Sequence, residues 1–352
     1  MYKPEFEGKT ILVTGGTGSI GSQVVRHLLN FNPKQIRVFS RDESKQFYLK
    51  HRLNDDQRVR MLLGDIRDEQ RLTRAMEGVN IVFHCAALKH VIATENDPSE
   101  AVQTNVIGTQ NVIHACLANG VEKMVGISTD KAADPTSVLG CTKLLSEKLV
   151  TSSTQYKGAK NTRFCFVRFG NVIGTRGSVI PLFIRQVKQG GPVTLTDPEM
   201  LRFFMTVDDS VQMIFKAMRL MRDNEVFILK MPVIRISDLA REIINRFAPR
   251  YGHQPESIDI KNIGRQIGER VYEKLLGREE CENALELPEM FVIGPHVDPR
   301  YDRPLRPEDY PGAIPVVRKE YTTQSQSDSL MTPEGIRELL DRSEEYINES
   351  LW

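Results

Sequence analysis

The alternation of strand and helix patterns in the first half of the chain is the feature that most restricts its fold. Six short runs rich in β-branched residues read as strands, at residues 10–14, 36–39, 59–63, 81–84, 123–128 and 162–168. Longer amphipathic stretches between them, at 20–30, 101–118 and 137–153, read as helices. This order predicts an α/β fold with a doubly wound parallel sheet covered by helices on both faces. Ligands of such sheets bind at the carboxyl ends of the strands.

A glycine-rich turn follows the first strand directly, in the sequence TGGTGSIG at residues 14–21, and opens the first helix. Glycines at this G-x-x-G-x-x-G spacing let the backbone turn tightly and approach a pyrophosphate, which binds to free N–H groups at the helix N-terminus. The context predicts a Rossmann-type dinucleotide site rather than a plain glycine turn. The residues expected to bind the coenzyme here are Gly15, Thr17, Gly18, Ser19, Ile20 and Gly21.

The end of the second strand indicates which dinucleotide is bound. An acidic residue there would hold the 2′-hydroxyl of NAD, but the strand ends at Ser40-Arg41, with Lys45 one turn later. Cationic side chains suit the 2′-phosphate of NADP, so the sequence favours NADP. The alternative is a solvated helix start that Asp42 merely caps. Further coenzyme contacts are expected from Asp65, Ile66, Ala86, Ala87, Lys89, Asn105 and Lys143.

The composition argues against several other classes of protein. The chain has 352 residues, 40% of them hydrophobic and 26% charged, and a formal net charge of +1, so nothing favours nucleic acid or a membrane surface as a partner. No apolar run is long enough to span a bilayer. The five cysteines are scattered and never spaced as C-x-x-C, so no metal site or disulfide framework is expected. No signal peptide pattern precedes the first strand, which predicts a cytoplasmic protein.

The region after the fifth strand carries the candidate catalytic residues. Ser128-Thr129-Asp130-Lys131 comes first, and Leu139 and Lys143 follow on one face of a helix. Short-chain dehydrogenases carry Y-x-x-x-K here, in which the tyrosine is the general base and the lysine holds the nicotinamide ribose. In this chain a leucine stands at the tyrosine position and cannot accept a proton. Cys141 should point away from that face and is interpreted as a packing residue.

Taken jointly, motifs across residues 8–290 make the chain resemble a narrower family within the extended short-chain dehydrogenases. This family comprises the nucleotide-sugar 4,6-dehydratases of bacterial capsule, flagellin-glycan and surface-polysaccharide pathways, including UDP-N-acetylglucosamine 4,6-dehydratase. The motifs are TGGTGSIG at 14–21, SRDESKQ at 40–46, GDIRD at 64–68, AALKHV at 86–91, TNVIGTQNVI at 104–113, STDKAADPTSVLGCTK at 128–143, RFGNVIGTRGSVIP at 168–181 and DPEMLRFFMTVDDSV at 197–211.

The resemblance implies a reaction in which NADP takes a hydride from sugar C4, water is eliminated across C5 and C6, and the hydride returns to C6. It places the elimination on an Asp-Lys pair at Asp130-Lys131, with Lys143 at the coenzyme. A lysine acts as a base near neutral pH only if burial or nearby positive charge destabilises its ammonium. Without the tyrosine, Thr129, Asp130 or Lys131 must accept the C4 hydroxyl proton. The alternative is an exposed turn in which Asp130 caps and Lys131 is solvated.

The substrate is expected to contact residues of the second half of the chain. In the family that this chain resembles, Asn171 and the loop with Ser178, Val179 and Pro181 meet the sugar diphosphate. Arg202 could clamp the diphosphate bidentately, or could form a surface ion pair with Asp197 or Glu199. Segment 264–270 resembles the family's R-x-G-E-K element, which contacts the nucleotide, although Arg265 sits one position early and Arg270 replaces the lysine. UDP is the default nucleotide and guanine stays open. Candidate substrate ligands also include His90 and Glu269.

These observations predict a Rossmann domain over 1–170 with a return segment at about 206–240. They predict a smaller α/β substrate lobe at 171–205 and 241–290, and a C-terminal arm and helix at 291–352. The expected activity is 4,6-dehydration of UDP-N-acetylglucosamine or a close relative. A 4-epimerase and a catalytically silent NADP-binding protein are the alternatives. The family resemblance also suggests a homo-oligomer.

Overall fold

The computed structural model describes residues 2–265, 269–295 and 304–350. The chain divides into two compact units. The first comprises Met1–Arg168, Val211–Leu229 and Gly277–Lys319, and the second comprises Phe169–Ser210, Lys230–Leu276 and Glu320–Trp352. Each unit is described by itself.

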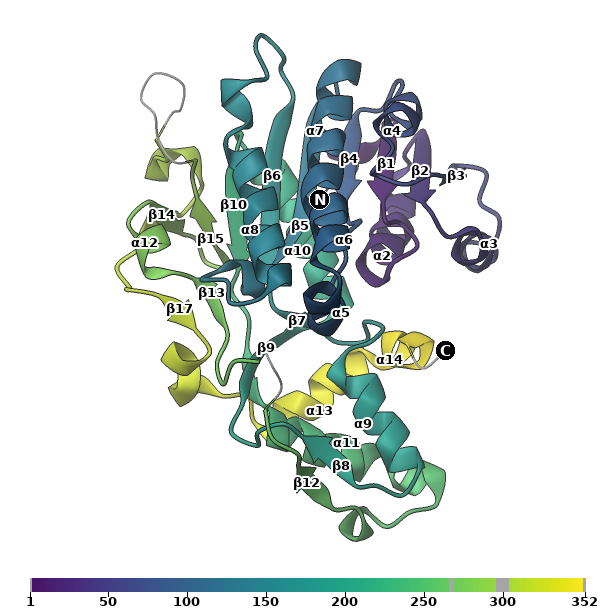
Figure 1. The fold of residues 1–352 in the computed structure, drawn as a ribbon, viewed down its shortest axis with the longest axis vertical. Helices are drawn as coiled ribbons and strands as arrows, with labels where there is room; N and C mark the ends of the chain where they lie inside the picture. The colour runs from purple at the N-terminus through teal and green to yellow at the C-terminus, as the bar shows by residue number, and fades with distance from the viewer. Residues whose placement is uncertain (1, 266–268, 296–303, 351–352) are drawn as a thin grey trace. The chain divides into compact units, whose positions relative to one another are not determined.

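Within the described residues, the first unit is built on a ten-stranded sheet in the order β16-β14-β15-β10-β6-β5-β4-β1-β2-β3 (Figure 1). Strands β1 to β4 and their neighbours pair in parallel, with Thr14 opposite both Phe39 and His84. The antiparallel strands β15, β14 and β16 extend the sheet beyond β10. The strands are β1 Thr10–Thr14, β2 Gln35–Ser40, β3 Val59–Leu63, β4 Ile81–His84, β5 Lys123–Thr129, β6 Arg163–Phe169, β10 Glu225–Leu229, β14 Ala284–Glu286, β15 Met290–Ile293 and β16 Ile314–Pro315.

Helices cover both faces of this sheet. On one face Phe6, Phe31, Phe83 and Phe215 pack together, which joins α1, η1 and α10 to β4. On the other face α7 packs against α4 and α8, in front of the sheet in Figure 1. The helices are α1 Lys3–Phe6, α2 Ser19–Leu28, η1 Leu29–Phe31, α3 Glu43–Arg52, α4 Glu69–Ala75, α5 Val91–Asn96, α6 Pro98–Ala101, the π-helix η2 Val102–Ile107, α7 Gly108–Asn119, η3 Asp130–Ala132, α8 Val138–Thr151, η4 Ser153–Gln155, α10 Val207–Leu220, α12 Arg278–Cys281 and η7 Pro307–Asp309.

The second unit has a core of its own, in which Phe183 and Ile184 of α9 pack with Ile243 and Phe247 of α11 and Ile336 of α13. Small sheets surround this core in the orders β11-β9-β7, β12-β8 and β13-β17. The elements are β7 Asn171–Val172, α9 Val179–Lys188, β8 Val193–Leu195, β9 Leu201–Met205, β11 Val233–Arg235, α11 Ile236–Phe247, η5 Pro249–Tyr251, η6 Pro255–Ser257, β12 Ile260–Asn262, β13 Lys274–Leu276, β17 Tyr321–Thr322, η8 Gln324–Ser329, α13 Pro333–Arg342 and α14 Glu344–Ser350.

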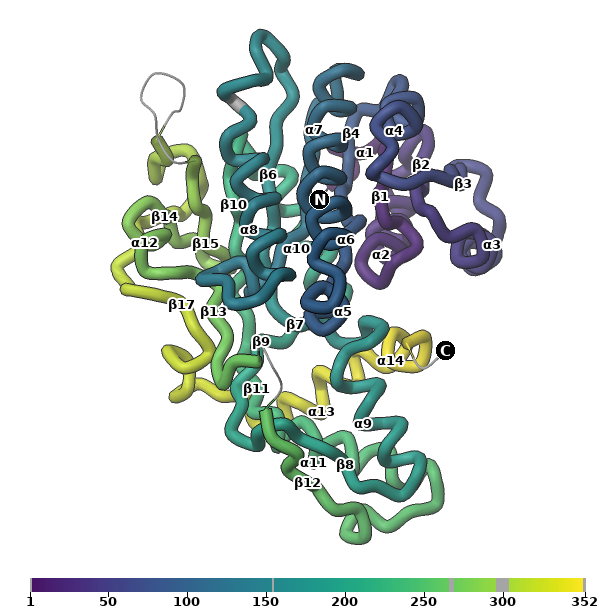
Figure 2. Tube along the Cα trace, in the orientation of Figure 1, coloured from purple at the N-terminus to yellow at the C-terminus, as the bar shows by residue number. Residues whose placement is uncertain are grey.

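The parallel Rossmann-type sheet and its six predicted strands are confirmed to within one or two residues. The predicted boundaries differ further along, because β14, β15 and β16 join the large sheet instead of a substrate lobe or an arm. Figure 2 shows β14 and β15 beside β10. The return segment is 211–229 rather than 206–240. The predicted C-terminal helix begins after its cap residue Thr332 but breaks at Ser343 into α13 and α14. Residues 296–303 of the predicted C-terminal arm lie outside the described residues.

Candidate functional site

The first half of the site lies where parallel strands β1, β4 and β5 end side by side. The register that pairs Thr14 with His84, and β4 with β5, brings the glycine turn, Ala86-Ala87 and Thr129 to one edge of the sheet. The carboxyl edge of a doubly wound sheet is where such folds bind their ligands. The strand ends therefore bring the glycine turn and the Thr129 region, two sequence-predicted parts of the site, to the same edge of the sheet.

The glycine turn packs so closely that side chains would not fit. Gly15 has φ +63°, and a Cβ there would lie 2.7 Å from the Cα and N of Ala86. A Cβ on Gly21 would lie 2.4 Å from the carbonyl oxygen of Gly15, so α2 packs directly on the turn. Gly18 caps α2 in an extended conformation, and no side chain accepts its first N–H groups. Such an uncapped helix N-terminus binds an anion well, so these residues fit a dinucleotide pyrophosphate.

Replacing Gly15 by alanine, G15A, should abolish coenzyme binding and lower the thermal midpoint of unfolding. The new methyl group would collide with the Ala86 backbone in addition to straining a left-handed residue. Gly78 offers a matched control, because its φ is +69° and nothing lies within 4 Å of an added Cβ. G78A should cost only about 1 kcal/mol from backbone strain and should keep full coenzyme affinity. Equal losses in both variants would contradict the packing role of Gly15.

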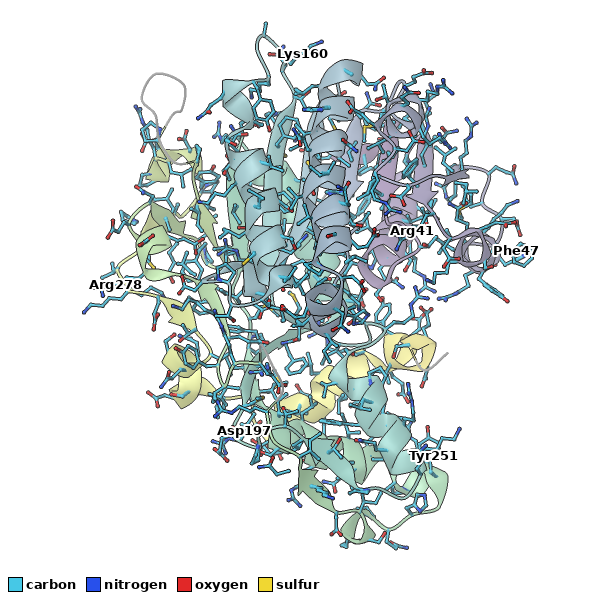
Figure 3. The ribbon with its side chains drawn as sticks, in the orientation of Figure 1. Arg41, Phe47, Lys160, Asp197, Tyr251 and Arg278 are labelled. Carbon is cyan, nitrogen blue, oxygen red and sulfur yellow. The ribbon has the colours of Figure 1, made fainter. Side chains whose placement is uncertain are left out.

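At the residues predicted to bind the adenosine half of the coenzyme, cationic side chains lie beside acidic ones. Arg41 lies 3.7 Å from a carboxylate oxygen of Asp65, and Lys45 lies 2.8 Å from Asp42, which also caps α3. Both cations are more than half exposed, and Figure 3 shows Arg41 beside the strands while Phe47 points outward from α3. Asp42 is therefore a helix cap, as the alternative reading of the sequence held, and both cations at this end of β2 also lie beside acidic side chains.

The loop after β4 is held by Asn105 from the π-helix. Its side-chain amide accepts a hydrogen bond from the N–H of Leu88 at 2.8 Å and donates to Thr142 at 3.1 Å. The backbone carbonyl oxygen of Asn105 accepts hydrogen bonds from the hydroxyl groups of Thr109 and Ser146. These bonds satisfy a carbonyl that the π-helix takes out of regular α-helical pairing. Asn105 thus fixes the loop that carries Ala86, Ala87, Lys89 and His90, of which the last three are exposed.

Ile66, which is expected to contact the coenzyme, is largely buried. Its side chain is only 4% exposed. A Cβ on Gly108 would lie 2.6 Å from Cδ1 of Ile66, so the glycine leaves room for this side chain. Ile66 therefore supports the start of α7. The hydrogen bonds from Arg67 hold the pKa of neighbouring Asp65 below its usual value, although burial opposes this.

Thr129, Asp130 and Lys131 form one connected corner at the end of β5. The Thr129 hydroxyl donates to Asp130 Oδ1 at 2.8 Å, and Lys131 Nζ lies 3.2 Å from both carboxylate oxygens. The Asp130 side chain is 4% exposed and that of Lys131 is 35% exposed. A solvated turn is therefore wrong for Asp130, since its carboxylate is buried against two proton-carrying partners. The corner can accept, hold and release protons.

Helix α8 brings Lys143 next to this corner. Gly140 allows the approach, because a Cβ there would lie 2.3 Å from the carbonyl oxygen of Lys131. Leu139, which stands at the tyrosine position of the resembled motif, is 3% exposed. Cys141 is exposed, so its interpretation as a packing residue is wrong. It lies on the outer face of α8, as the helical spacing predicted.

Lys143 is a buried lysine whose pKa is lowered. Its ammonium donates to the carbonyl of Ile127 and lies over the Phe166 ring. Burial lowers the pKa of Lys143 to about 8, although the negative charge of Glu147 opposes the shift. Burial and the nearby Lys143 charge lower the pKa of His84 to about 3, and burial raises the pKa of the Cys85 thiol to about 12. Both neighbours are therefore uncharged near neutral pH.

Affinity for the coenzyme should fall as pH rises through about 8, because the Lys143 ammonium that would hold the nicotinamide ribose is lost there. Direct binding titrations between pH 6.5 and about 9.5 would measure this. A K143M variant should bind more weakly and show no such decline. Affinity that stays constant to the alkaline limit in the parent protein would contradict the role of the ammonium.

A buried ion network behind α8 was not predicted from the sequence. Arg168 is 1% exposed and forms two hydrogen bonds to Glu147, one turn after Lys143. Two more join it to Glu280 of α12, at 2.9 and 2.8 Å. Opposite charges of Glu147 and Glu280 raise the pKa of Arg168 far above its usual value despite burial. The network fixes α8, and thus Lys143, against β6.

In the second unit, Glu273 organises the residues expected to meet the substrate. Its carboxylate accepts hydrogen bonds from Asn171 Nδ2, at 3.1 and 3.0 Å, and from the N–H of Phe203 at 3.1 Å. Arg202 Nε lies 3.3 Å from the same carboxylate. The Arg202 guanidinium also donates to the carbonyls of Arg270 and Val271. The alternative pairing of Arg202 with Asp197 or Glu199 is therefore wrong.

The remaining substrate candidates lie around two loops of the second unit. Ser178 precedes α9 as its N-cap residue, yet its hydroxyl is buried without a partner and caps nothing. The N-terminus of α9, with Val179 and Pro181, is thus free of a side-chain cap. Arg265 is exposed and lies 3.9 Å from Asp197, while Glu269 accepts from Thr196. Residues 266–268 of the predicted nucleotide element lie outside the described residues.

Among the residues that the structure describes, no group of three or more His, Cys, Asp or Glu side chains could hold a metal ion. In the same residues, no helix combines the length and the apolar character that crossing a membrane requires. All five cysteines are free thiols.

The sheet order, the glycine turn and the corner after β5 define a Rossmann-type α/β protein. The family described as polysaccharide biosynthesis protein matches residues 11–295, and the chain belongs to that family.

Individual relatives agree with this assignment. A protein of Methanocaldococcus jannaschii named an uncharacterized membrane protein is 53% identical, over 83% of this chain and 87% of its own. UDP-N-acetylglucosamine 4,6-dehydratase (inverting) of Campylobacter jejuni is 40% identical, over 83% and 84%. UDP-glucose 4-epimerase of Rickettsia rickettsii is 40% identical, over 82% and 83%. The X-ray structure of Pen from Bacillus thuringiensis matches with a TM-score of 0.87 and 40% identity, over 99% of each chain.

Proposed function

We propose that this protein is a nucleotide-sugar 4,6-dehydratase that acts on UDP-N-acetylglucosamine with NADP. The observation that carries the proposal is the buried Asp130 carboxylate, joined to Lys131 and Thr129 at the carboxyl edge of the sheet. A dehydratase needs a base for the C5 proton and an acid for the C6 hydroxyl beside one coenzyme. The Campylobacter dehydratase at 40% identity supports this reaction.

In the proposed reaction, Thr129, Asp130 and Lys131 carry out each proton transfer. When bound, the coenzyme supplies reversible transfer of a hydride from sugar C4 and back to C6. The proton of the C4 hydroxyl passes to the Thr129 hydroxyl, whose own proton passes to Asp130, 2.8 Å away. This route replaces the tyrosine that Leu139 cannot provide. Once Asp130 is neutral, Lys131 loses the anionic partner that favours its ammonium, and its partly exposed amine releases that proton to solvent.

The elimination then uses the same two side chains. The 4-ketone makes the C5 proton acidic, and neutral Lys131 removes it. Protonated Asp130 gives its proton to the C6 hydroxyl, which leaves as water. Lys143 stays protonated near neutral pH and disfavours a second ammonium at Lys131. The Lys131 ammonium then returns its proton to C5, which completes the 4-keto-6-deoxy product. Asp130 ends the cycle as a carboxylate, ready for the next C4 hydroxyl.

The mass and the NMR spectrum of the product test the proposed reaction directly. Incubation with NADP and UDP-N-acetylglucosamine should give a nucleotide sugar lighter by one water, with a methyl signal at C6 and a ketone at C4. A panel of UDP- and GDP-linked sugars would identify the nucleotide. A product of unchanged mass would show epimerisation instead, and no turnover of any sugar in the panel would favour a silent NADP-binding protein.

A 4-epimerase is the second candidate, because Rickettsia relatives of that name are also about 40% identical. Epimerisation at C4 uses the same hydride chemistry but needs no base at C5. The buried Asp130-Lys131 pair is the feature that favours dehydration. A homo-oligomeric state and a cytoplasmic location remain predictions.

The choice of NADP over NAD rests on Arg41 and Lys45. In a double variant, R41A/K45A, affinity for NADP should fall by about 10- to 100-fold, because charge-assisted contacts to the 2′-phosphate are lost. Affinity for NAD should change by less than about twofold, since its ribose carries no phosphate. Isothermal titration with both coenzymes measures the difference. Equal affinity of the parent protein for NAD and NADP would contradict the assignment.

A further inference from the structure

His84, the last residue of β4, belongs to a buried chain of hydrogen bonds that the proposed reaction does not use. Its side chain is 3% exposed, and each of its ring nitrogens has a hydroxyl partner. Nδ1 lies 2.8 Å from the hydroxyl of Thr14 at the end of β1, and Nε2 lies 3.1 Å from the hydroxyl of Thr109 in α7. A neutral imidazole has one N–H donor and one acceptor, so the two hydrogen bonds run in opposite senses.

The Thr109 hydroxyl decides which ring nitrogen carries the proton. It lies 2.6 Å from the backbone carbonyl oxygen of Asn105, which can only accept, so the single hydroxyl proton of Thr109 is used there. The Thr109 oxygen then accepts from His84, which places the ring proton on Nε2. Nδ1 is left as the acceptor, and the Thr14 hydroxyl donates to it. Burial and the nearby Lys143 charge, which lower the pKa of His84 to about 3, agree with a neutral ring.

The same chain of bonds holds both ends of the loop that follows β4. At one end, the N–H of Ala86 donates to the Thr14 hydroxyl oxygen at 3.4 Å. At the other end, the N–H of Leu88 donates to the side-chain oxygen of Asn105 at 2.8 Å. Because the two ends are two residues apart, the bonds close a ring through Ala86, Thr14, His84, Thr109, Asn105 and Leu88. His84 is the member of the ring that joins β1 to α7.

The ring sets the position of Ala86 against the glycine turn. A Cβ on Gly15 would lie 2.7 Å from both Cα and N of Ala86, so the two backbones are in close contact. Resting on the coenzyme site of the proposed function, we infer that His84, as its neutral Nε2–H tautomer, positions the loop 86–88 against the glycine turn for the coenzyme. An apolar side chain of similar size would fill the space but open the ring. The loop would then have to be ordered when the coenzyme binds, at a cost in affinity.

Nitrogen NMR of protein with isotope-labelled histidine tests the tautomer with no coenzyme added. The ring signals of His84 are those that H84M removes. In the parent protein they should show a proton on Nε2 alone, and T14V should keep this state because Thr109 still imposes it. In T109V the Nδ1–H tautomer should become populated, since the acceptor for Nε2–H is gone. A proton on Nδ1, or on both nitrogens, in the parent protein would overturn the inference.

Coenzyme affinity separates positioning of the loop from stabilisation of the fold. T109V opens the ring at a residue that is 2% exposed, and affinity for NADP, measured by calorimetry, should fall about tenfold. T14V should cause a similar loss. The double variant T14V/T109V should lose no more than the weaker-binding single variant, because a ring that is open at one place is not opened again. Additive losses, or parent affinity in T109V, would overturn the inference.

S153A is the matched control, because it removes a buried hydroxyl of the same unit. Ser153 is 0% exposed and donates to the side chain of Asn224 at 2.7 Å, directly before β10 and so at the amino ends of the parallel strands. S153A should lower the thermal midpoint of unfolding as T109V does, yet keep the parent affinity for NADP. Equal affinity losses in S153A and T109V would overturn positioning and leave general destabilisation. A parent protein that binds neither NADP nor NAD would refute the proposed function, whereas the NMR result is independent of it, so the two failures are distinguishable.

Discussion

Replacing Lys131 by alanine, K131A, lowers the rate of product formation by about 10²- to 10⁴-fold, the range that a positioned general base contributes. The Lys131 amine is the group proposed to remove the C5 proton, and its Nζ lies 3.2 Å from both Asp130 oxygens. The first half of the reaction should survive, because the C4 hydroxyl proton goes to Thr129 and Asp130. Quenched reactions should therefore contain a 4-keto sugar that has kept its C6 hydroxyl, together with reduced coenzyme.

Two further variants make this result specific. D130N should block both the oxidation at C4 and the elimination of water, since an amide cannot accept the proton from Thr129. K160A removes an exposed lysine from the loop between η4 and the start of β6, labelled at the top of Figure 3, and should behave like the parent protein. Full dehydratase activity in K131A would refute the base assignment. Loss of hydride transfer in K131A would move Lys131 to the oxidation step.

Replacing Arg168 by methionine, R168M, should reduce the free energy of unfolding by about 3–5 kcal/mol, the usual cost of removing one partner from a buried ion pair. Arg168 is 1% exposed, and without it Glu147, at 2% exposure, would keep a buried carboxylate with no cation. Glu280 would lose two hydrogen bonds as well. Urea denaturation measures the change, with the slope of the transition unaltered if the native fold persists.

The matched comparison is R306M, which removes an arginine of the same unit. The Arg306 side chain is 54% exposed and lies 3.9 Å from Glu308. Because solvent screens this ion pair, R306M should reduce the free energy of unfolding by less than about 1 kcal/mol. In a double variant, E147M/R168M, the loss should be smaller than in R168M, because one buried charge disappears with its partner. Equal stability of R168M and R306M would contradict a structural role for the network.

Much of the fold and part of the site followed from local sequence patterns. The six strands could be placed because burial on both faces of a parallel sheet requires continuous apolar runs, as in β1, where all five residues are buried. The glycine turn could be assigned because its spacing and its place between strand and helix are contiguous in the chain. Asp130 and Lys131 are adjacent residues, so their pairing needed no knowledge of the tertiary fold.

Other features could not be predicted from those patterns. The extension of the sheet by β14, β15 and β16 was missed because short strands near turns carry little periodicity. Cys141 was assigned correctly to the outer face of α8 but wrongly to packing, since helical spacing gives direction and not coverage. Arg202 was assigned its partners from nearby acidic residues, whereas its actual partner lies 71 positions later, at Glu273.

The sequence by itself determined the features that depend on neighbours in the chain: the six parallel strands and their alternation with helices, the glycine turn, and the Thr129, Asp130 and Lys131 corner. Only the tertiary structure decided which distant carboxylates pair with Arg168 and Asn171. Glu280 reaches Arg168 across 112 positions and Glu273 reaches Asn171 across 102. The physical reason is that a buried charge or amide needs a partner of defined geometry, and folding alone selects which of the chain's many carboxylates lies within reach.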